Sequence, residues 1–352
     1  MAQPMRPILR PVMPELHSLR GLACLAVLFF HGFWCYLPRG PLHALTAGGH
    51  YGVNLFFVLS GFLITGILLD SKQRQDYFVR FYKRRVLRIL PAYYMMIALL
   101  AMYGLSPRFL GLSLLHVANM APAFGVALAY GPFWSLAVEE QFYFLWPLIV
   151  RRSSTRLLVV VLFGIIVNNL RLAFVANPEP WIEFRLWYSS HGLALGALLA
   201  IFLRSSMNSR RNVVRVAAAA AMTGIGLIVL QSAVWQTFGW ELVFSAVLLS
   251  ALILGASRFE AWTRPRLLLF IGEISYGLYL VHVFVFAMYR RVIFVPNDTV
   301  HVLVQFFVCS VVSILLATAS RFTVESWFLG LKDKPLSIPR NQIISEELAA
   351  AR

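Results

Sequence analysis

Arg20 and His31 are ionisable side chains eleven residues apart inside one apolar segment, Leu16 to Trp34. An ionisable group within a bilayer is costly unless it faces protein, water or a partner. Eleven residues of α-helix return to nearly the same face, with a rise of roughly 16 Å. We therefore expect Arg20 and His31 to line one wall of a path, with Arg20 nearer its entry. A guanidinium group there suits an anion, and an imidazole suits proton transfer.

Two adjacent carboxylates, Glu139 and Glu140, lie about two turns into a further apolar segment, which runs from Phe133 to Pro147. Adjacent helical residues point roughly 100° apart, so the two carboxylates are not expected to occupy one spot. We expect a functional role for at least one of them. The other has a simpler alternative, which is to pair with Arg171 or Arg185.

The segment Ile271 to His282 aligns Ser275, Tyr279 and His282 on one helix face. An intramembrane histidine often makes only a hydrogen-bonded helix–helix contact, and this alternative stays open for His282. By depth alone, we expect one group of side chains to converge in the outer part of the membrane: His31, His282, Glu139, Glu140 and Arg171.

A basic cluster precedes Pro91 and comprises Arg80, Lys83, Arg84, Arg85 and Arg88. One interpretation is a membrane anchor that touches anionic lipid headgroups. The other is a phosphate-binding mouth for a nucleotide-like donor such as coenzyme A, because guanidinium groups pair with phosphate in a bidentate way. The sequence leaves both open.

The composition determines the class of protein that must position these residues. The chain has 352 residues, of which 59% are hydrophobic and only 13% charged, and this is typical of a polytopic membrane protein. Most of its basic residues fall in short loops, so the net charge of +16 does not indicate nucleic-acid binding. The chain has no metal-ligand spacing, serine-hydrolase elbow or phosphate-binding glycine loop, so we expect no metal.

The hydrophobic runs predict an all-α bundle of about ten membrane-spanning helices, with both termini cytoplasmic because basic residues concentrate in the loops on that side. We expect a cytoplasmic segment at 1–13, a membrane unit at 14–325 and a polar cytoplasmic tail at 326–352. The apolar stretch 109–124 contains Pro122 and is predicted to be re-entrant or interfacial. The predicted spans are 16–36, 52–69, 88–104, 134–150, 156–175, 185–203, 213–231, 240–256, 268–289 and 301–320.

Five motifs in a fixed order resemble the integral-membrane acyltransferase-three family over roughly residues 14 to 325. They are Leu19-Arg-Gly21 with His31, Gly52-Val-Asn-Leu-Phe-Phe-Val-Leu-Ser-Gly-Phe-Leu-Ile64, Phe81-Tyr-Lys-Arg-Arg-Val-Leu-Arg-Ile-Leu-Pro91, Trp134-Ser-Leu-Ala-Val-Glu-Glu-Gln-Phe-Tyr143 and Gly272-Glu-Ile-Ser-Tyr-Gly-Leu-Tyr-Leu-Val-His282. The resemblance implies a bacterial inner- or plasma-membrane enzyme with no permanent cofactor. Its expected partners are the bilayer, cytoplasmic acyl-CoA, commonly acetyl-CoA, and a hydroxyl of a carbohydrate or glycosylated acceptor.

Carried onto this sequence, the resemblance assigns Arg20 and His31 to the first-helix pair, Arg84, Arg85 and Arg88 to the donor motif, and Glu139 and Glu140 to the acidic motif. His31 is then expected to act as a general base or as a transient acyl carrier, with Glu139 or Glu140 holding its tautomer. Three alternatives remain at this point: acylation of a small metabolite such as a macrolide, a transporter, and a non-catalytic scaffold.

Overall fold

The computed structural model describes residues 7–171, 190–230, 233–293, 296 and 298–331, and these residues form helices and loops with no strand among them. The all-α prediction is therefore confirmed for this part of the chain. The helices are α1 (Pro14–Phe33), α2 (Pro41–Ala47), η1 (Gly48–Tyr51), α3 (Gly52–Ser71), α4 (Tyr77–Tyr103), α5 (Pro107–Leu114), η2 (Ala118–Phe124), α6 (Pro132–Arg152), α7 (Thr155–Leu170), α9 (His191–Phe202), α10 (Arg210–Ile228), α11 (Ala233–Gly255), η5 (Glu260–Thr263), α12 (Arg266–Val292), α13 (Thr299–Ser320), η6 (Arg321–Glu325) and α14 (Ser326–Gly330).

Seven helical stretches of the described residues are long and apolar enough to cross a membrane, where the sequence predicts ten spans. Two more helices, α7 and α9, are apolar but short. The helix α6 is long enough to cross, at about 30 Å, but it carries Glu139, Glu140 and Gln141 in its middle. The stretch 109–124 is broken into α5 and η2, as expected for a segment that does not cross. The protein is a multi-pass membrane protein, while its count of ten spans stays a prediction.

Glycines bring the principal helix pairs into close contact. A Cβ atom on Gly21 of α1 would meet the backbone of Leu268 in α12, and one on Gly272 of α12 would meet the backbone of His17. Similarly, Gly61 of α3 lies against the backbone of Leu193 in α9. Helices within a membrane gain little from hydrophobic burial against each other, so close packing at small residues is a main source of their association.

We expect Gly61→Leu to destabilise the bundle, because its side chain would overlap the backbone of Leu193 and force α3 and α9 apart. Overpacking of this kind costs about 1–3 kcal/mol or more. Thermal unfolding in detergent, followed by tryptophan fluorescence, measures the loss. The control is Gly164→Leu in α7, where an added Cβ meets nothing within 4 Å. Equal losses from the two variants would contradict the packing argument.

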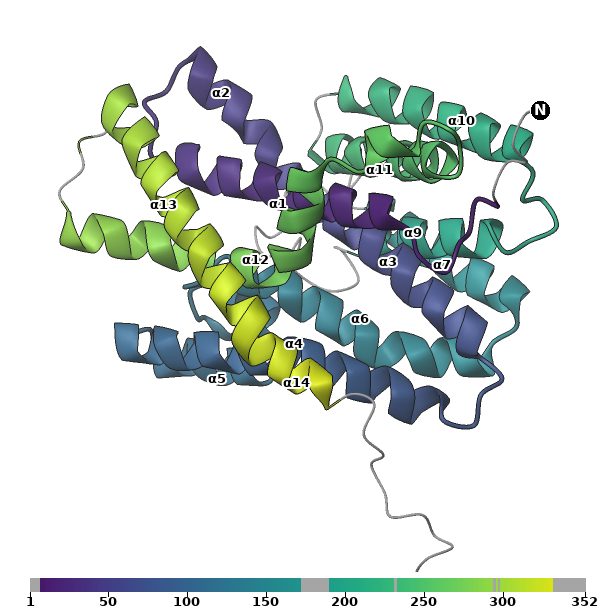
Figure 1. Cartoon of the computed structure of the whole chain (residues 1–352), viewed down its shortest axis with the longest axis horizontal. Helices are drawn as coiled ribbons and strands as arrows, with labels where there is room; N and C mark the ends of the chain where they lie inside the picture. Colours follow the sequence, from purple (N-terminus) through teal and green to yellow (C-terminus); the bar gives the residue numbers. More distant parts are fainter. Residues whose placement is uncertain (1–6, 172–189, 231–232, 294–295, 297, 332–352) are drawn as a thin grey trace, which may run out of the picture.

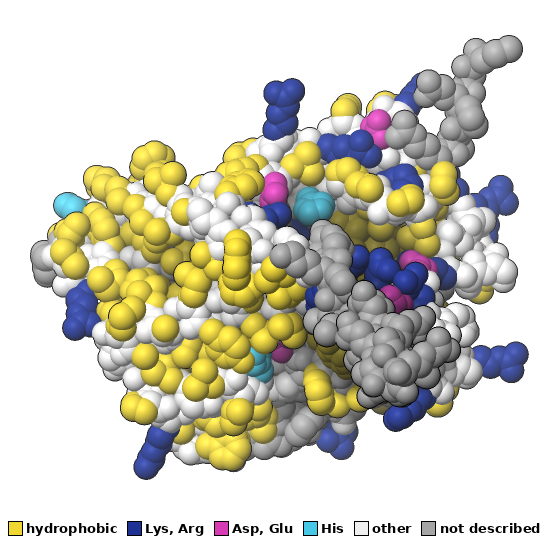
Figure 2. Space-filling view, turned by 60° about the horizontal axis from the view of Figure 1, so that its bottom comes forward, with side chains coloured by type: hydrophobic (Ala, Val, Ile, Leu, Met, Phe, Trp, Pro, Cys, Tyr) yellow, Lys and Arg dark blue, Asp and Glu magenta, His cyan; other side chains and the backbone are white. Residues whose placement is uncertain are grey.

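The long helices lie side by side, as Figure 1 shows, with α10 and α11 at one edge, α4 and α5 at the opposite edge, and α1, α3 and α12 between them. The start of α3 lies beside the second half of α1, since Gly52 contacts Ala23 and Val27, so these two helices are antiparallel. The helices α1 and α12 are parallel, since Gly272 lies at His17 and His282 lies at His31. Figure 2 shows apolar side chains over the left and middle of one face, with Lys and Arg gathered towards its right.

Candidate active site

A cavity of about 340 Å³ lies among α1, α3, α4, α6 and α12, and the segment just before α1 contributes to one end. This end, which we call the mouth, is lined by Val12, Leu16 and Ile67. A polar band follows, and the far end is again mainly apolar. Because α1 and α3 are antiparallel, the start of α3 supplies the far end. The far-end residues are Val53, Phe56, Ser135, Leu136 and Tyr279.

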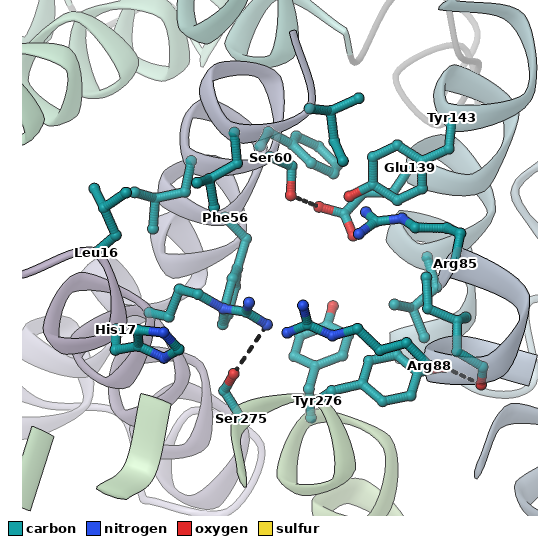
Figure 3. Close-up of a pocket in the computed structure, with 18 of the residues that line it drawn as sticks. Leu16, His17, Phe56, Ser60, Arg85, Arg88, Glu139, Tyr143, Ser275 and Tyr276 are labelled. Atoms are coloured by element: carbon teal, nitrogen blue, oxygen red, sulfur yellow. Dashed lines mark hydrogen bonds between the residues drawn. The ribbon is translucent and has the colours of Figure 1, made fainter. Parts of the chain in front are cut away.

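Three guanidinium groups meet in the polar band, from Arg20 of α1 and from Arg85 and Arg88 of α4. Arg20 donates to Ser275 Oγ across 3.3 Å, and the guanidinium carbon of Arg85 lies 3.6 Å from the centre of the Tyr143 ring. Figure 3 shows Arg85 and Arg88 reaching into the cavity from one wall, with Leu16 and His17 on the opposite wall. Arg20 and Arg88 are close enough for their charges to repel each other. A bound anion would relieve this repulsion.

Both acidic residues of α6 line the same cavity. Ser60 donates a hydrogen bond of 2.6 Å to Glu139 Oε1, and Glu139 also lies within charge range of Arg20 and Arg85. Glu140 interacts electrostatically with Arg85. The two adjacent acids therefore line one cavity, because the cavity is wide enough to meet both faces of α6. Of the suggested partners, Arg171 is exposed at the end of α7 and Arg185 lies outside the described residues.

The basic cluster divides between the cavity and the surface. Arg85 and Arg88 line the cavity, whereas Arg80, Lys83 and Arg84 are absent from its wall among the residues that the structure describes. The predicted donor role of these three is therefore not supported by their position, and the reason is the orientation of α4. Its buried face is set by Tyr77, Phe81, Ile89, Ala92 and Met96. Arg85 and Arg88 continue that face, while Arg80 and Arg84 are exposed.

His31 and His282 form a hydrogen-bonded pair. His282 Nε2 lies 3.2 Å from His31 Nδ1, and the ring centres are 5.0 Å apart. His282 Nδ1 lies 3.0 Å from the carbonyl oxygen of Leu278, and His31 Nδ1 lies 3.1 Å from that of Val27. The structure thus places His282, rather than Glu139 or Glu140, beside His31.

The tautomers of this pair follow from the two carbonyls. A carbonyl oxygen only accepts, so His282 Nδ1 must carry the proton that it donates to Leu278. In a neutral imidazole, His282 Nε2 is then an acceptor, and His31 Nδ1 must donate to it and to Val27. His31 Nε2 is left with the lone pair, and it lies 3.9 Å from the position that a Cβ of Gly131 would take. This is the nitrogen that can accept a proton.

The histidine pair lies just beyond the far end of the cavity, not in its wall. Tyr279 separates the cavity from the histidine pair. Its ring lines the cavity, and the ring centres of Tyr279 and His282 are 5.8 Å apart. The phenol oxygen of Tyr279 is 2.6 Å from Ser135 Oγ. The histidines and the acidic residues were predicted to converge at one place. The structure brings them together only in part, because Glu139 and Glu140 lie in the polar band and the histidines lie past Tyr279.

Sequence reasoning assigned no role to several residues of the cavity wall. His17 lies one turn before Arg20 and was given no function, and Ser60 lies in the glycine-containing motif of α3. Tyr143 lies one turn after Glu139, and Tyr276 one turn before Tyr279, on the same helix faces. Their spacing from Glu139 and from Tyr279 is the signal that would have found the two tyrosines.

Comparison with known proteins gives a consistent result. A family model described as "Acyltransferase domain" matches residues 13–321. The peptidoglycan O-acetyltransferase OatA of Listeria monocytogenes is 26% identical, over 97% of this chain and 61% of that protein. The O-acetyltransferase OatA of Staphylococcus aureus is 26% identical, over 77% of this chain and 50% of that protein.

The chain thus spans about half to three fifths of the length of these relatives. No solved structure matches it significantly. The family model covers most of the membrane-embedded residues described above, including the histidine pair and the cavity wall from Met13 onward. The chain therefore belongs to the acyltransferase family that this model describes.

Proposed function

We propose that the protein is a membrane O-acyltransferase that moves an acyl group, foremost acetyl, from acyl-CoA to a hydroxyl of a cell-surface carbohydrate. The observation that carries the proposal is the position of the arginine-lined cavity next to the histidine pair, in which His31 Nε2 is free to accept a proton. The carbohydrate acceptor is inferred from the relatives, one of which is named for acetylation of peptidoglycan.

The donor is assigned to the cavity. Its phosphates would be bound by Arg20, Arg85 and Arg88, and its acyl thioester would reach the far end through the long arm that joins the two. Arg20 and His31 are separated by a rise of roughly 16 Å along α1, which leaves room for such an arm. Glu139 would hold Arg20 and Arg85 in place between rounds of donor binding.

His31 is assigned the role of general base. Its Nε2 accepts the proton of the acceptor hydroxyl as the oxygen attacks the thioester carbonyl, and it returns the proton to the departing thiolate. His282 keeps the Nδ1 proton of His31 in place and accepts its hydrogen bond when the ring becomes charged. The alternative, in which His31 carries the acyl group, predicts labelled protein when donor is supplied without acceptor.

The direction of transfer follows from the proposed orientation. With both termini cytoplasmic, residues 14–325 form the membrane unit and the segments 1–13 and 326–352 lie in the cytoplasm. The mouth of the cavity, beside the start of α1 and the basic start of α4, then opens to the cytoplasmic donor. The histidine pair faces the outer half of a bacterial inner or plasma membrane, where a carbohydrate acceptor would be met.

The test uses the full chain in proteoliposomes, with radiolabelled acetyl-CoA and peptidoglycan fragments as acceptor. We expect label in the acceptor. Labelled acetyl-CoA hydrolysis or protein labelling without any labelled sugar, across peptidoglycan, lipid-linked sugars and macrolides, would exclude this acceptor class. A complete lack of donor turnover, with transport of a solute instead, would favour a transporter.

We expect His282→Phe to lower kcat by about 10- to 100-fold, because Phe keeps a ring but cannot accept the hydrogen bond of His31 Nδ1, and loss of a hydrogen bond to a charged group costs about 1.5–3 kcal/mol. The donor KM is expected to stay near the wild-type value, since His282 is absent from the cavity wall formed by the described residues. Steady-state kinetics with varied acetyl-CoA separates these constants. An unchanged kcat would remove His282 from the mechanism.

A further inference from the structure

The far end of the cavity holds two hydroxyl groups in a mainly apolar environment, those of Ser135 and Tyr279. Phe56 packs against the Tyr279 ring, with ring centres 5.9 Å apart, and Leu136 lies beside it in the wall. Both hydroxyl-bearing residues are buried. A thioester that reaches this point lies between the guanidinium groups and the histidine pair, and its carbonyl oxygen needs a hydrogen-bond donor when it becomes negatively charged.

Most hydroxyl protons of the cavity are already committed to strong acceptors. Ser275 donates to the carbonyl of Gly272, and Tyr276 donates to the carbonyl of Ile89. Ser60 donates to the carboxylate of Glu139. If one of these hydroxyls turned to the thioester carbonyl oxygen, it would have to give up a carbonyl or carboxylate that it already hydrogen-bonds, and the exchange would gain little.

The phenol proton of Tyr279 is different. Ser135 Oγ donates to the carbonyl oxygen of Pro132 at 3.2 Å, so its single proton is used there. We therefore assign the contact of 2.6 Å between Ser135 Oγ and Tyr279 Oη as a hydrogen bond from the phenol to the serine oxygen. The Tyr279 proton therefore rests on a neutral hydroxyl, a weaker acceptor than an oxyanion.

We propose that Tyr279 is a further catalytic residue, which turns its phenol O–H from Ser135 to the carbonyl oxygen of the bound acyl thioester and stabilises the oxyanion. This inference rests on the proposed function and adds to it the group that would stabilise the transition state. The position supports it, because the Tyr279 ring forms the cavity wall on one side and lies 5.8 Å from the His282 ring on the other.

The acceptor oxygen forms a bond to the carbonyl carbon while His31 Nε2 takes its proton, and the carbonyl π electrons move to the oxygen that Tyr279 hydrogen-bonds. When the intermediate collapses, the carbonyl re-forms and the carbon–sulfur bond breaks. The thiolate then receives the proton from His31, so that an ester and a free thiol leave and Tyr279 keeps its proton throughout.

The test compares Tyr279→Phe with Ser135→Ala in the full chain, using acetyl-CoA and a carbohydrate acceptor. Both variants break the same hydrogen bond, so a structural role predicts similar losses. The oxyanion role predicts that Tyr279→Phe lowers kcat by about 10²- to 10³-fold with little change in donor KM. It also predicts a far smaller loss for Ser135→Ala, since the phenol keeps its proton and is released from its resting partner.

Three results would overturn the proposal: equal losses in the two variants, a raised donor KM as the main effect of Tyr279→Phe, or near-wild-type kcat in Tyr279→Phe. The double variant checks the assignment, because it should match Tyr279→Phe alone. Thermal unfolding in detergent confirms that each variant is folded, and Phe keeps the ring that packs against Phe56. If the wild type itself transfers no acyl group, the proposed function fails, which is distinct from these outcomes.

Discussion

Replacement of His31 by Gln is expected to lower acyl transfer by about 10²- to 10⁴-fold, the usual contribution of a general base. Gln keeps a polar side chain of similar reach but has no nitrogen that accepts a proton at neutral pH. The loss should fall on kcat, and donor KM should change little, because His31 is not part of the cavity wall among the described residues. Single-turnover transfer from radiolabelled acetyl-CoA measures the chemical step.

The matched control is His50→Gln at the same end of the bundle. His50 is exposed, lies 5.6 Å from Phe30 by ring centres, and contacts the carbonyl of Ala47. It has no link to His282 in the structure, so its replacement should leave the rate near wild type. If His31→Gln keeps full activity, or if His50→Gln is equally damaging, the general-base assignment fails.

The helix face shared by Arg20 and His31 could be predicted because it depends only on helix periodicity, although only Arg20 lines the cavity. Arg20 contacts Ser275 and His31 contacts His282, so both face α12. Ser275 and His282 are seven residues apart, which again returns to one face of a helix. The predicted alignment of Ser275, Tyr279 and His282 is likewise confirmed by their contacts. The sequence could not supply the partner of each side chain, since that depends on how α1 and α12 pack.

Side chains that meet across helices were missed for the same reason. Glu241, which is completely buried, lies 2.6 Å from His191 Nδ1 and accepts a hydrogen bond of 2.8 Å from Asn54. These residues come from α11, α9 and α3, and no sequence spacing connects them. A lone acid in an apolar run was the available signal, and its contacts fit the polar interhelical bonding that holds membrane helices together.

The basic cluster shows where periodicity alone misleads. Arg80, Arg84 and Arg88 do follow one stripe of α4, yet Arg88 lines the cavity and Arg80 and Arg84 are exposed. A stripe drifts around a helix by 40° for every four residues, since 3.6 residues make about one turn. The neighbours of α4 decide which part of the stripe is enclosed. Exposed arginines at this end still suit anionic lipid headgroups, so we propose each of the two interpretations for different members of the cluster.

This division gives a matched pair of variants on one helix. Arg88→Gln is expected to raise the KM for acetyl-CoA by about 10- to 100-fold, because a hydrogen bond between charged groups contributes about 1.5–3 kcal/mol. Arg84→Gln removes the same charge one turn away, on the exposed face, and should leave donor KM near wild type. The comparison uses steady-state kinetics at fixed acceptor and constant ionic strength, since screening alters charge-assisted binding.

The substrate dependence of the Arg88 variant tests the contact itself. If Arg88 binds a donor phosphate, the increase in donor KM of Arg88→Gln over wild type should shrink with a truncated donor that lacks the phosphates, such as S-acetyl pantetheine. With that donor, neither protein can make the contact between Arg88 and a phosphate. A lipid-anchor role predicts instead that both variants reduce membrane insertion or yield, with donor KM unchanged. Equal increases in donor KM for Arg84→Gln and Arg88→Gln would show that the positive charges of α4 act on the donor at long range. The assignment of the donor to the cavity would then be wrong.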